Sequence, residues 1–518
     1  MGVNLAEVLL AGAGDPAREM RPALREPGRI VTLGALASRT ARVAGALRSL
    51  GVDRGDRVAI LMPDGADTVA AILGAIRIGA VAVPLSELAR PNDLRALILD
   101  AGPRVAIVQA ALEPALDEVR SELPSLRDII VVGGAHAGER SFEQLVAQAE
   151  PAASATVRPD DPAFLLYSAG TDGRPRGVPH THAAPVAAFK AVGQGILGLG
   201  DGDRVLTTVK LATAYGFGAG LVFPLLAGAQ AWLLPAQARS ELVLESVRLF
   251  QPTIVFGTPS LYGQLATDVS PGAPPLACAR ALVAGAEALP ATLTAHIEAR
   301  LGAPVLPGYG VTEALSFVLA TPPGQGRAGS SGLVVPGYKV RVVGDDGAEV
   351  GPSEIGTLEI SGPTVARGYW NQPDETARTF VDGWLRTSDR FLVDADGWYF
   401  HCGRADELLR VGGKWVATGE VEQTLLRHEA VWECAVVGAP DEHGLEKPFA
   451  FVVPNVGHAP GPELERALIE FVKRELAPFK YPRWVEFVDA LPKGPTGKLQ
   501  RYKLRPKKRR AGTAPPVA

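Results

Sequence analysis

The 518-residue sequence predicts an α/β protein with a large N-terminal domain and a small C-terminal domain. Three observations support this fold class. Helix-like and strand-like segments alternate through the first half, the pattern changes to short strands and turns near Gly332, and a short unit with its own strands and helix closes the chain. Such alternation predicts doubly wound, mostly parallel sheets with helices on both faces. A chain of this length is also too long for a single core.

The first half contains helix and strand segments in regular succession. Hydrophobic spacing predicts a helix over residues 33–50, with Thr32 as its N-cap, followed by a buried strand over 57–61. Three further pairs repeat this order: helix 67–78 with strand 80–84, helix 94–101 with strand 105–108, and helix 242–250 with strand 253–256. In sheets of this kind, ligands bind at the carboxyl ends of the strands.

The second half changes texture and predicts a β-rich subdomain, because turn sequences recur at 345–347, 381–383 and 394–397. A small unit follows, with strands predicted over 433–437, 448–453 and 484–487 and a helix over 464–475. We therefore expect four parts along the chain. They are an N-terminal domain over 1–403, a hinge over 404–408, a small mobile α+β domain over 409–505, and a basic, disordered tail over 506–518.

The composition is that of a soluble globular protein, with 47% hydrophobic and 21% charged residues and a net charge of −4. This charge predicts neither a nucleic-acid partner nor binding to an anionic membrane. Cys278, Cys402 and Cys434 form no disulfide or metal spacing, which favours the cytoplasm. The longest apolar run, from Val69 to Leu85, contains Arg77 and is too short to span a bilayer.

A glycine-rich segment follows the apolar strand-like run at 163–167 and is the most informative part of the sequence. Gly170, Gly173 and Gly177 alternate there with hydroxyl-bearing residues and arginines. Glycines allow backbone N–H groups to face a ligand, and hydroxyl and guanidinium groups add donors for phosphate oxygens. The segment lacks the Gly-Lys-Ser/Thr ending of a P-loop. By itself, a segment of this kind is more often an ordinary surface loop.

Four more motifs follow this segment in order: Gly308-Tyr-Gly-Val-Thr-Glu313, Trp384-Leu-Arg-Thr-Ser-Asp389, Gly403-Arg-Ala-Asp-Glu407 and Leu491-Pro-Lys-Gly-Pro-Thr-Gly-Lys498. Together the five motifs resemble those of the adenylate-forming enzymes, which include acyl- and aryl-CoA ligases, peptide-synthetase adenylation domains and luciferases. The resemblance covers nearly the whole chain. It implies that ATP and a carboxylate form an acyl-AMP, which a thiol then attacks, and that the protein supplies positioning and charge stabilisation.

The phosphate segment departs from the family pattern at a few positions. Asp172 stands where the pattern has a Thr or Ser, and Arg176 stands where it has a Lys. Arginine keeps the positive charge. A carboxylate beside pyrophosphate is repulsive unless it is paired, so Asp172 either pairs with Arg174 or Arg176 or turns outward. Ala169 and Ser388 are milder departures, from Ser and Gly.

The resemblance implies roles for residues at the nucleotide. Lys498 would stabilise the charge that develops between the carboxylate and the α-phosphate, Thr312 would contact that phosphate, and Glu313 would hold Mg²⁺. Tyr309 would stack on adenine, and Asp389 would bind the ribose hydroxyls. The implied ATP- and AMP-binding residues are Ser168, Gly170, Thr171, Gly173, Arg176, Gly285, Glu287, Tyr309, Thr312, Asp389, Arg404 and Lys498.

The second half-reaction implies a further set of residues. Asp406 matches the family hinge, about which the small domain rotates between the two half-reactions. Gly412 and Gly413 would let a pantetheine arm pass close to the backbone. Lys414 and Trp415 lie in the same loop, and Lys414 either meets a phosphate of CoA or is a plain exposed lysine.

Residues 210–218 lie where these enzymes line the pocket for the acid, and here they look most like the benzoate–CoA ligase branch. The implied acid-binding residues are Ala214, Tyr215, Gly216, Gly308, Gly310 and Ser316. They would shape a small, flat, mostly apolar pocket. Ser316 stands where benzoate enzymes often have His, so its hydroxyl could bind a ring substituent or leave more room.

The expected activity is therefore that of an AMP-forming aryl-CoA ligase that uses ATP, Mg²⁺ and coenzyme A. A second hypothesis is that the chain is a stand-alone enzyme that loads an aryl acid onto the phosphopantetheine of an acyl carrier protein. A third is a non-catalytic descendant that binds an acyl-adenylate. The sequence leaves open whether the chain is a monomer or a homodimer.

Overall fold

The computed structural model describes residues 4–134, 139–169, 175–270, 272, 274–404, 408–411, 414–441, 445–492, 499 and 501–504. The chain divides into two compact units. Unit 1 comprises Met1–Val340 and Glu359–Arg386, and unit 2 comprises Arg341–Leu358 and Thr387–Ala518. The hinge expected at 404–408 stays a prediction, because residues 405–407 lie outside the described residues.

A seven-stranded sheet forms one half of unit 1, in the order β7-β6-β5-β3-β4-β8-β9. Its strands are β3 (Arg57–Leu61), β4 (Val81–Pro84), β5 (Val105–Gln109), β6 (Asp128–Val132), β7 (Arg140–Ser141), β8 (Pro162–Ala169) and β9 (Pro175–Thr181). All neighbouring strands are parallel except the last pair, β8 and β9, which form an antiparallel hairpin. The glycine-rich segment predicted to bind phosphate is the connection of this hairpin.

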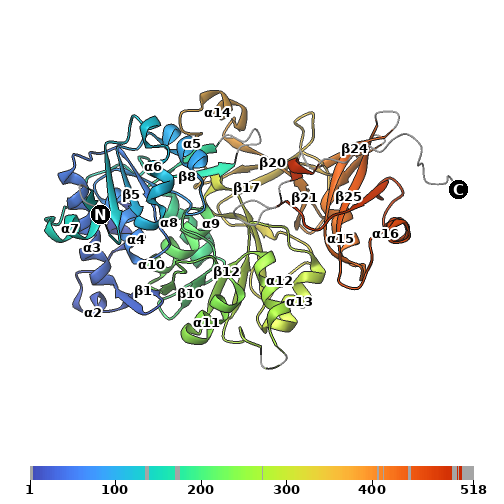
Figure 1. Cartoon of the computed structure of the whole chain (residues 1–518), viewed down its shortest axis with the longest axis horizontal. Helices are drawn as coiled ribbons and strands as arrows, with labels where there is room; N and C mark the ends of the chain where they lie inside the picture. The colour runs from blue at the N-terminus through green and yellow to red at the C-terminus, as the bar shows by residue number, and fades with distance from the viewer. Residues whose placement is uncertain are drawn as a thin grey trace. The chain divides into compact units, whose positions relative to one another are not determined.

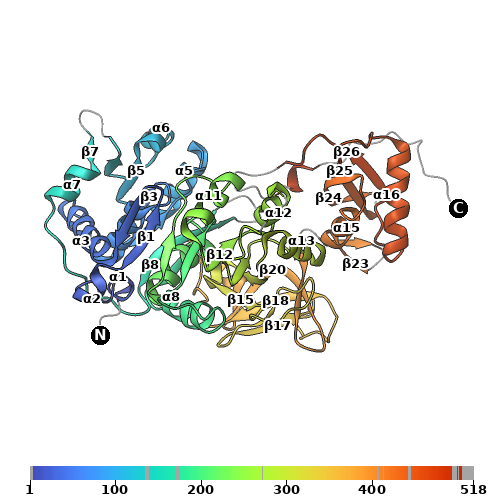
Figure 2. The ribbon, with the colours of Figure 1, turned by 90° about the horizontal axis from the view of Figure 1, so that it is seen from below.

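Helices cover both faces of this sheet (Figures 1 and 2). Leu94 and Ile98 of α5 (Pro91–Ala101) pack with Leu116 of α6 (Glu113–Asp117) on one face. Helix α4 (Ala66–Arg77) also packs against the strands, and it contacts α3 (Leu33–Ser49). All residues of α4 from Thr68 to Ile76 are buried, so the longest apolar run of the sequence is an interior helix followed by a buried strand.

A nine-stranded sheet forms the other half of unit 1, in the order β16-β15-β14-β13-β12-β10-β11-β1-β2. Its strands are β1 (Pro22–Glu26), β2 (Arg29–Thr32), β10 (Arg204–Thr207), β11 (Gln230–Trp232), β12 (Ile254–Gly257), β13 (Ala281–Ala284), β14 (Val305–Gly310), β15 (Phe317–Ala320) and β16 (Leu333–Val334). The strands from β1 to β14 in this order are parallel neighbours, and antiparallel strands close both edges.

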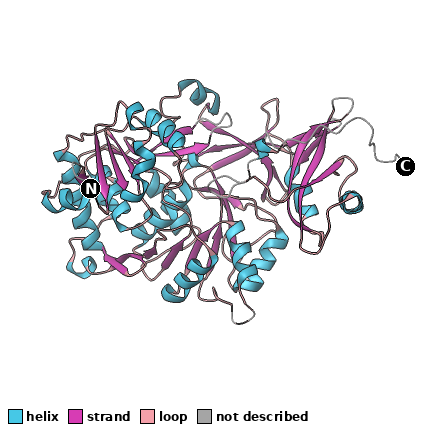
Figure 3. Cartoon of the chain, in the orientation of Figure 1, coloured by secondary structure: helices cyan, strands magenta, loops and turns pink. Residues whose placement is uncertain are grey.

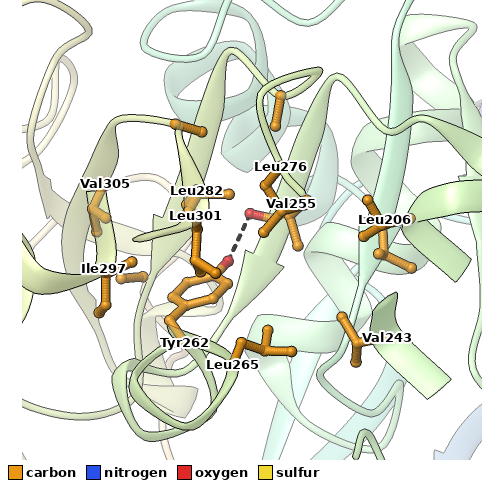
Figure 4. Packing of buried hydrophobic residues seen from close by; sticks show 14 of the residues in the cluster. Leu206, Val243, Val255, Tyr262, Leu265, Leu276, Leu282, Ile297, Leu301 and Val305 are labelled. Atoms are coloured by element: carbon orange, nitrogen blue, oxygen red, sulfur yellow. Dashed lines mark hydrogen bonds between the residues drawn. The ribbon is translucent and has the colours of Figure 1, made fainter. Parts of the chain in front are cut away.

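Three helices pack on one face of this second sheet: α11 (Ser240–Phe250), α12 (Pro259–Asp268) and α13 (Ala291–Leu301). Tyr262 of α12 lies at the centre of their core, and its hydroxyl donates to the Val255 carbonyl at 2.9 Å (Figure 4). The buried phenol is thereby satisfied, and burying a phenol without a hydrogen-bond partner would be costly.

The remaining helices and strands are shorter or lie in the second half of the chain. Figure 3 colours the helices and strands of the chain by type. The helices are α1 (Leu5–Leu9), α2 (Pro16–Glu19), α7 (Phe142–Gln148), α8 (Ala184–Ala188), α9 (Ala214–Phe217), α10 (Phe223–Ala227) and α14 (Pro373–Thr379). A further sheet has the order β17-β18-β20-β19, with β21 beside β20. Its strands are β17 (Lys339–Val343), β18 (Gly356–Ser361), β19 (Phe380–Val381), β20 (Trp384–Val393) and β21 (Tyr399–Arg404).

The last part of unit 2 has its own apolar core, which includes Val436, Val452 and Leu468. It contains the hairpin β22 (Leu408–Val411) and β23 (Lys414–Ala417), the helices α15 (Thr418–Leu425) and α16 (Pro462–Glu475), and the sheet β24 (Val431–Pro440), β25 (Glu446–Pro454) and β26 (Trp484–Phe487). This is the small α+β domain that the sequence predicts.

The predicted elements agree with the observed ones within a few residues. Thr32 caps α3 as expected, because its hydroxyl accepts the N–H of Ala35 at 3.2 Å. The three cysteines are free. Among the described residues, none of the helices combines the length and the apolar character that a bilayer crossing requires.

Candidate active site

The hairpin of β8 and β9 brings two predicted phosphate ligands together in unit 1. Ser168 and Arg176 are direct partners in its register, one pair before the connection. Both side chains are half-buried. Gly170, Thr171 and Gly173 lie outside the described residues, as do Asp172 and Arg174. The described part of the hairpin thus presents one hydroxyl and one guanidinium group at the base of the predicted phosphate segment.

Glu313 lies at the centre of a hydrogen-bond network in the same unit. It follows β14, in a short 3₁₀ turn over Thr312–Ala314. The hydroxyl of Ser168 donates to its Oε1 at 3.0 Å, and the hydroxyl of Tyr369 donates to the same oxygen at 2.9 Å. Two predicted site residues from motifs 145 positions apart, Ser168 and Glu313, are therefore in direct contact.

The network extends through Tyr369 to the arginine of the phosphate segment. The Arg176 guanidinium lies over the Tyr369 ring, 5.5 Å from its centroid, and its Nη2 is 2.6 Å from Oε1 of Glu375. Burial, with the nearby Glu313 carboxylate, raises the pKa of Tyr369, so the phenol keeps its proton and can donate it. Glu375, at the start of α14, is the described partner of Arg176. Neither Tyr369 nor Glu375 belongs to a recognised motif, so the sequence did not predict them.

The carboxylate of Glu313 fits the role of a magnesium ligand. Both hydroxyl donors use Oε1, and the described residues place no donor on Oε2. An oxygen with spare lone pairs suits a hard cation such as Mg²⁺. The described residues contain no group of three or more His, Cys, Asp or Glu side chains that could hold a metal. The ion would therefore need oxygens from the substrate in addition to Glu313.

Tyr215 and Phe317 form an aromatic wall beside two predicted site glycines, Gly308 for the acid and Gly285 for the nucleotide. Their ring centroids lie 5.2 Å apart. A Cβ at Gly285 would lie 2.7 Å from the Phe317 ring and 3.2 Å from the Tyr215 ring, and a Cβ at Gly308 would lie 2.6 Å from Phe317. These positions have no room for a side chain, so both glycine backbones lie directly against the wall. Phe317 was not predicted from the sequence.

The position of Tyr215 is fixed by its hydroxyl and its backbone. The hydroxyl lies 2.8 Å from the Val283 carbonyl and 3.2 Å from that of Gly257. Burial raises the pKa of Tyr215, which keeps the phenol neutral. A Cβ at Gly216 would lie 2.1 Å from the Lys210 carbonyl oxygen, so this turn requires glycine. Ala214, also predicted, is buried beside Tyr215 at the start of α9.

The turn between β14 and β15 holds the remaining acid-site candidates. Leu315 has a φ of +62°, in the left-handed region that side chains rarely adopt, and the N–H of Ser316 donates to the Ala314 carbonyl at 2.7 Å. A Cβ at Gly310 would lie 2.3 Å from the Ser316 carbonyl oxygen. Strain of this kind persists where the surroundings over-determine the backbone, and it is common at ligand sites.

The other nucleotide candidates of unit 1 have mixed surroundings. Tyr309 is half-buried in β14, where Leu319 is its register partner. Glu287 is exposed, and its Oε2 accepts the N–H and the hydroxyl of Ser260 at 2.9 and 2.6 Å. This carboxylate caps the N-terminus of α12. The nucleotide role of Glu287 stays a prediction, and its observed role is structural.

Two histidines at the end of β9 are buried in the scaffold. Burial lowers the pKa of His180 to about 3 and that of His182 to about 4, so both rings are neutral at neutral pH. His182 Nδ1 accepts the N–H of Leu5 at 3.0 Å, and the His180 ring lies 5.1 Å from that of Phe164. They stabilise the strand that follows the phosphate segment.

Unit 2 contains two predicted nucleotide ligands, Asp389 for the ribose and Arg404 for the ribose or a phosphate. They are direct register partners on β20 and β21. His401, which the sequence did not predict, places Nε2 3.1 Å from Oδ1 of Asp389. The Thr387 hydroxyl accepts the Asp389 N–H at 3.2 Å. The hairpin thus brings a carboxylate, an imidazole and a guanidinium residue to one place.

The candidates for the second half-reaction fall largely outside the described residues. Asp406, Gly412, Gly413 and Lys498 are outside them, and only the backbone of Lys414 and Trp415 is described, in β23. The chain on the C-terminal side of Lys498 is anchored within unit 2, because Arg501 Nη2 lies 2.6 Å from Oε2 of Glu422. The roles of these candidates stay predictions.

Comparison with known proteins places the chain in a family. Residues 16–370 match the AMP-binding enzyme family, and residues 420–498 match the AMP-binding enzyme C-terminal domain. The chain is 42% identical to a benzoate–CoA ligase of Thauera aromatica, over 92% of this chain and 90% of that protein. The expected hinge at 404–408 lies between the two matched stretches.

Solved structures agree with this placement. An anthranilate CoA ligase in complex with anthranoyl-AMP is similar with a TM-score of 0.90 and 36% identity, covering 96% of each chain. A benzoate CoA ligase from Burkholderia xenovorans LB400 is similar with a TM-score of 0.89 and 35% identity, covering 97% of this chain and 100% of that one.

Proposed function

The chain belongs to the AMP-binding enzyme family, and we propose that it is an AMP-forming aryl-CoA ligase for a benzoate-like acid. One observation supports the aryl substrate above the others. Tyr215 and Phe317 form an aromatic wall pressed against glycine backbones, in the same unit as the network around Glu313. An apolar wall of aromatic rings and glycine backbones suits an aromatic ring.

In the first half-reaction, an oxygen of the acid's carboxylate attacks the α-phosphorus of ATP, and pyrophosphate leaves. Ser168 and Arg176, at the base of the phosphate segment, would hold the departing phosphates. Glu313 would hold Mg²⁺ through Oε2, and the ion would supply charge neutralisation for the phosphate oxygens. Tyr369 would fix the orientation of the Glu313 carboxylate by its hydrogen bond to Oε1.

Residues of unit 2 complete the proposal. The Asp389 carboxylate would accept hydrogen bonds from the ribose hydroxyls. His401 would hold this carboxylate in place, and Arg404 lies beside it in the register of the hairpin. Lys498 would stabilise the negative charge on the α-phosphate in the transition state. In the second half-reaction the thiolate of coenzyme A attacks the acyl carbon and AMP leaves. Gly412 and Gly413 would border the pantetheine arm, after rotation about Asp406.

The test uses a panel of acids with ATP and coenzyme A. Benzoate, its hydroxy and amino derivatives and phenylpropenoates are compared with acetate and palmitate, with AMP release measured and the thioester identified by mass spectrometry. We expect the benzoates to react fastest. Faster turnover of palmitate than of any aryl acid would contradict the proposal.

The acceptor is tested in the same assay. An aryl-CoA ligase should turn over with coenzyme A, whereas a loading enzyme should turn over only with a phosphopantetheinylated carrier protein. If aryl acids support ATP–pyrophosphate exchange but neither acceptor is used, the thioester step is wrong. If no acid supports exchange, the chain is a binding protein and not a ligase.

A further inference from the structure

Lys210 lies at the centre of a charged cluster that no motif predicts. Its Nζ lies 3.0 Å from Glu87 Oε1 and 3.0 Å from each of three consecutive backbone carbonyls, those of Leu234, Pro235 and Ala236. An ammonium group has three N–H donors, so these four acceptors saturate it. All three N–H donors of the lysine therefore have acceptors within the protein.

Asp64 lies beside this lysine and binds the backbone of Leu211, the residue that follows Lys210. The residue is 6% exposed, and its Oδ2 and Oδ1 lie 3.1 and 3.3 Å from the backbone N of Leu211. Burial raises the pKa of Asp64 to about 7, against the opposing effects of Lys210 and of the Leu211 N–H. Glu87 acts in the same direction as burial.

The cluster joins the carboxyl ends of strands from both sheets of unit 1. Asp64 and Glu87 follow β3 and β4 of the seven-stranded sheet, each by three residues. Lys210 follows β10 of the nine-stranded sheet, and the three carbonyls follow β11. The carboxyl ends of parallel strands are where ligand-binding loops begin.

The backbone segment that the cluster holds, residues 210–216, contains Tyr215 of the aromatic wall. The Lys210 carbonyl accepts the N–H and the hydroxyl of Thr213 at 3.0 and 2.8 Å, and the Thr213 hydroxyl accepts the N–H of Gly216 at 3.1 Å. Gly216 also packs against the Lys210 carbonyl, so a shift of that carbonyl displaces the turn that carries Tyr215.

We propose that Asp64, Lys210 and Glu87 are positioning residues that fix the backbone of residues 210–216 and thereby set the affinity for the aryl acid. The inference rests on the proposed function, because it takes Tyr215 to border the acid. The cluster acts through Tyr215 and does not touch the substrate. The cluster therefore affects the affinity for the acid and leaves the affinity for ATP unchanged.

The test compares Michaelis constants for benzoate and for ATP in adenylation. Asp64→Ala leaves the buried N–H of Leu211 without an acceptor, and we expect the KM for benzoate to rise roughly tenfold with the KM for ATP within about twofold. Asp64→Asn keeps an acceptor oxygen at this N–H and should restore most of the affinity. Glu87→Gln is the milder change and should raise the KM for benzoate by about two- to threefold.

Asp203→Ala is the matched control, because Asp203 precedes β10 at the end opposite to Lys210. Its carboxylate accepts the Gly200 N–H at 3.0 Å and pairs with Arg280 at 3.0 Å. Its loss should lower stability without an acid-specific change in KM. Unchanged constants in both Asp64→Ala and Glu87→Gln, or equal rises for benzoate and ATP, would overturn the inference. Absence of benzoate turnover in the wild type would overturn the proposed function instead.

Discussion

The Glu313 network and the Asp64–Lys210–Glu87 cluster both place charged groups after strands of unit 1, but they use them differently. The two hydroxyl donors to Glu313 share Oε1, and the described residues leave Oε2 with spare lone pairs. Lys210 has four acceptors for three donors, and both oxygens of Asp64 face one backbone N–H. Among the described residues, the first group keeps an oxygen open to a ligand, whereas the second group is closed on the chain itself.

This difference separates a candidate binding site from a scaffold. A polar group that still has unused donors or acceptors can exchange water for a ligand at small cost, whereas a saturated group would first have to break its own bonds. Burial alone does not distinguish the two clusters, because Tyr369 and Asp64 are both buried. The comparison predicts that changes in the first cluster alter rates and that changes in the second alter stability and acid affinity.

The largest expected effect is that of Glu313→Gln. The amide keeps an acceptor oxygen for Ser168 and Tyr369 but loses the charge that a cation needs. We expect kcat/KM for adenylation to fall roughly 100- to 1,000-fold, with an unchanged unfolding midpoint. ATP–pyrophosphate exchange with benzoate measures the rate, and urea unfolding measures the stability.

Glu298→Gln is the matched control for this change, since Glu298 accepts the N–H of Val305 at 2.9 Å, at the opposite end of β14. This variant should retain the wild-type exchange rate. If both glutamine variants lose rate equally, the effect comes from β14 and the comparison fails.

Lys210→Met should have the next largest effect, and it should be on stability. The change removes the bonds to three carbonyls and leaves the Glu87 carboxylate without its cation. Removing one partner of a buried pair is strongly destabilising, and because these side chains are 24% and 13% exposed we expect a loss of about 2–3 kcal/mol. Urea unfolding checks the value. A variant of wild-type stability that no longer turns over benzoate would show that Lys210 contacts the substrate.

Tyr369→Phe should have the smallest of the three effects. The ring stays under Arg176 and the hydrogen bond to Glu313 is lost, which corresponds to about 1 kcal/mol or roughly a fivefold lower kcat. Tyr262→Phe is the control, because its hydroxyl is bonded in the apolar core of the second sheet. It should lower stability and leave kcat alone. The reverse result would place the functional tyrosine in the core.

The sequence by itself determined the fold class and the elements that local patterns encode. Thr32 caps α3, and the apolar run from Val69 became a buried helix and strand, because capping and hydrophobic periodicity depend on residues a few positions apart. The motifs also led to Ser168 and Glu313, which the fold brings together. For Lys498 and Asp406, which lie outside the described residues, the motifs remain the only guide.

Only the tertiary structure decided which side chains contact the candidate site residues and which contact the scaffold. Tyr369 reaches Glu313 from 56 positions away, and Asp64 reaches Leu211 from 147 positions away. Glu287, which the family resemblance assigns to the nucleotide, also caps α12 through Ser260. Such contacts depend on how strands and turns that are distant in the sequence pack together, and the spacing of residues along the chain does not predict this packing. Hydrogen bonds between segments far apart in the chain become visible only when the chain is folded.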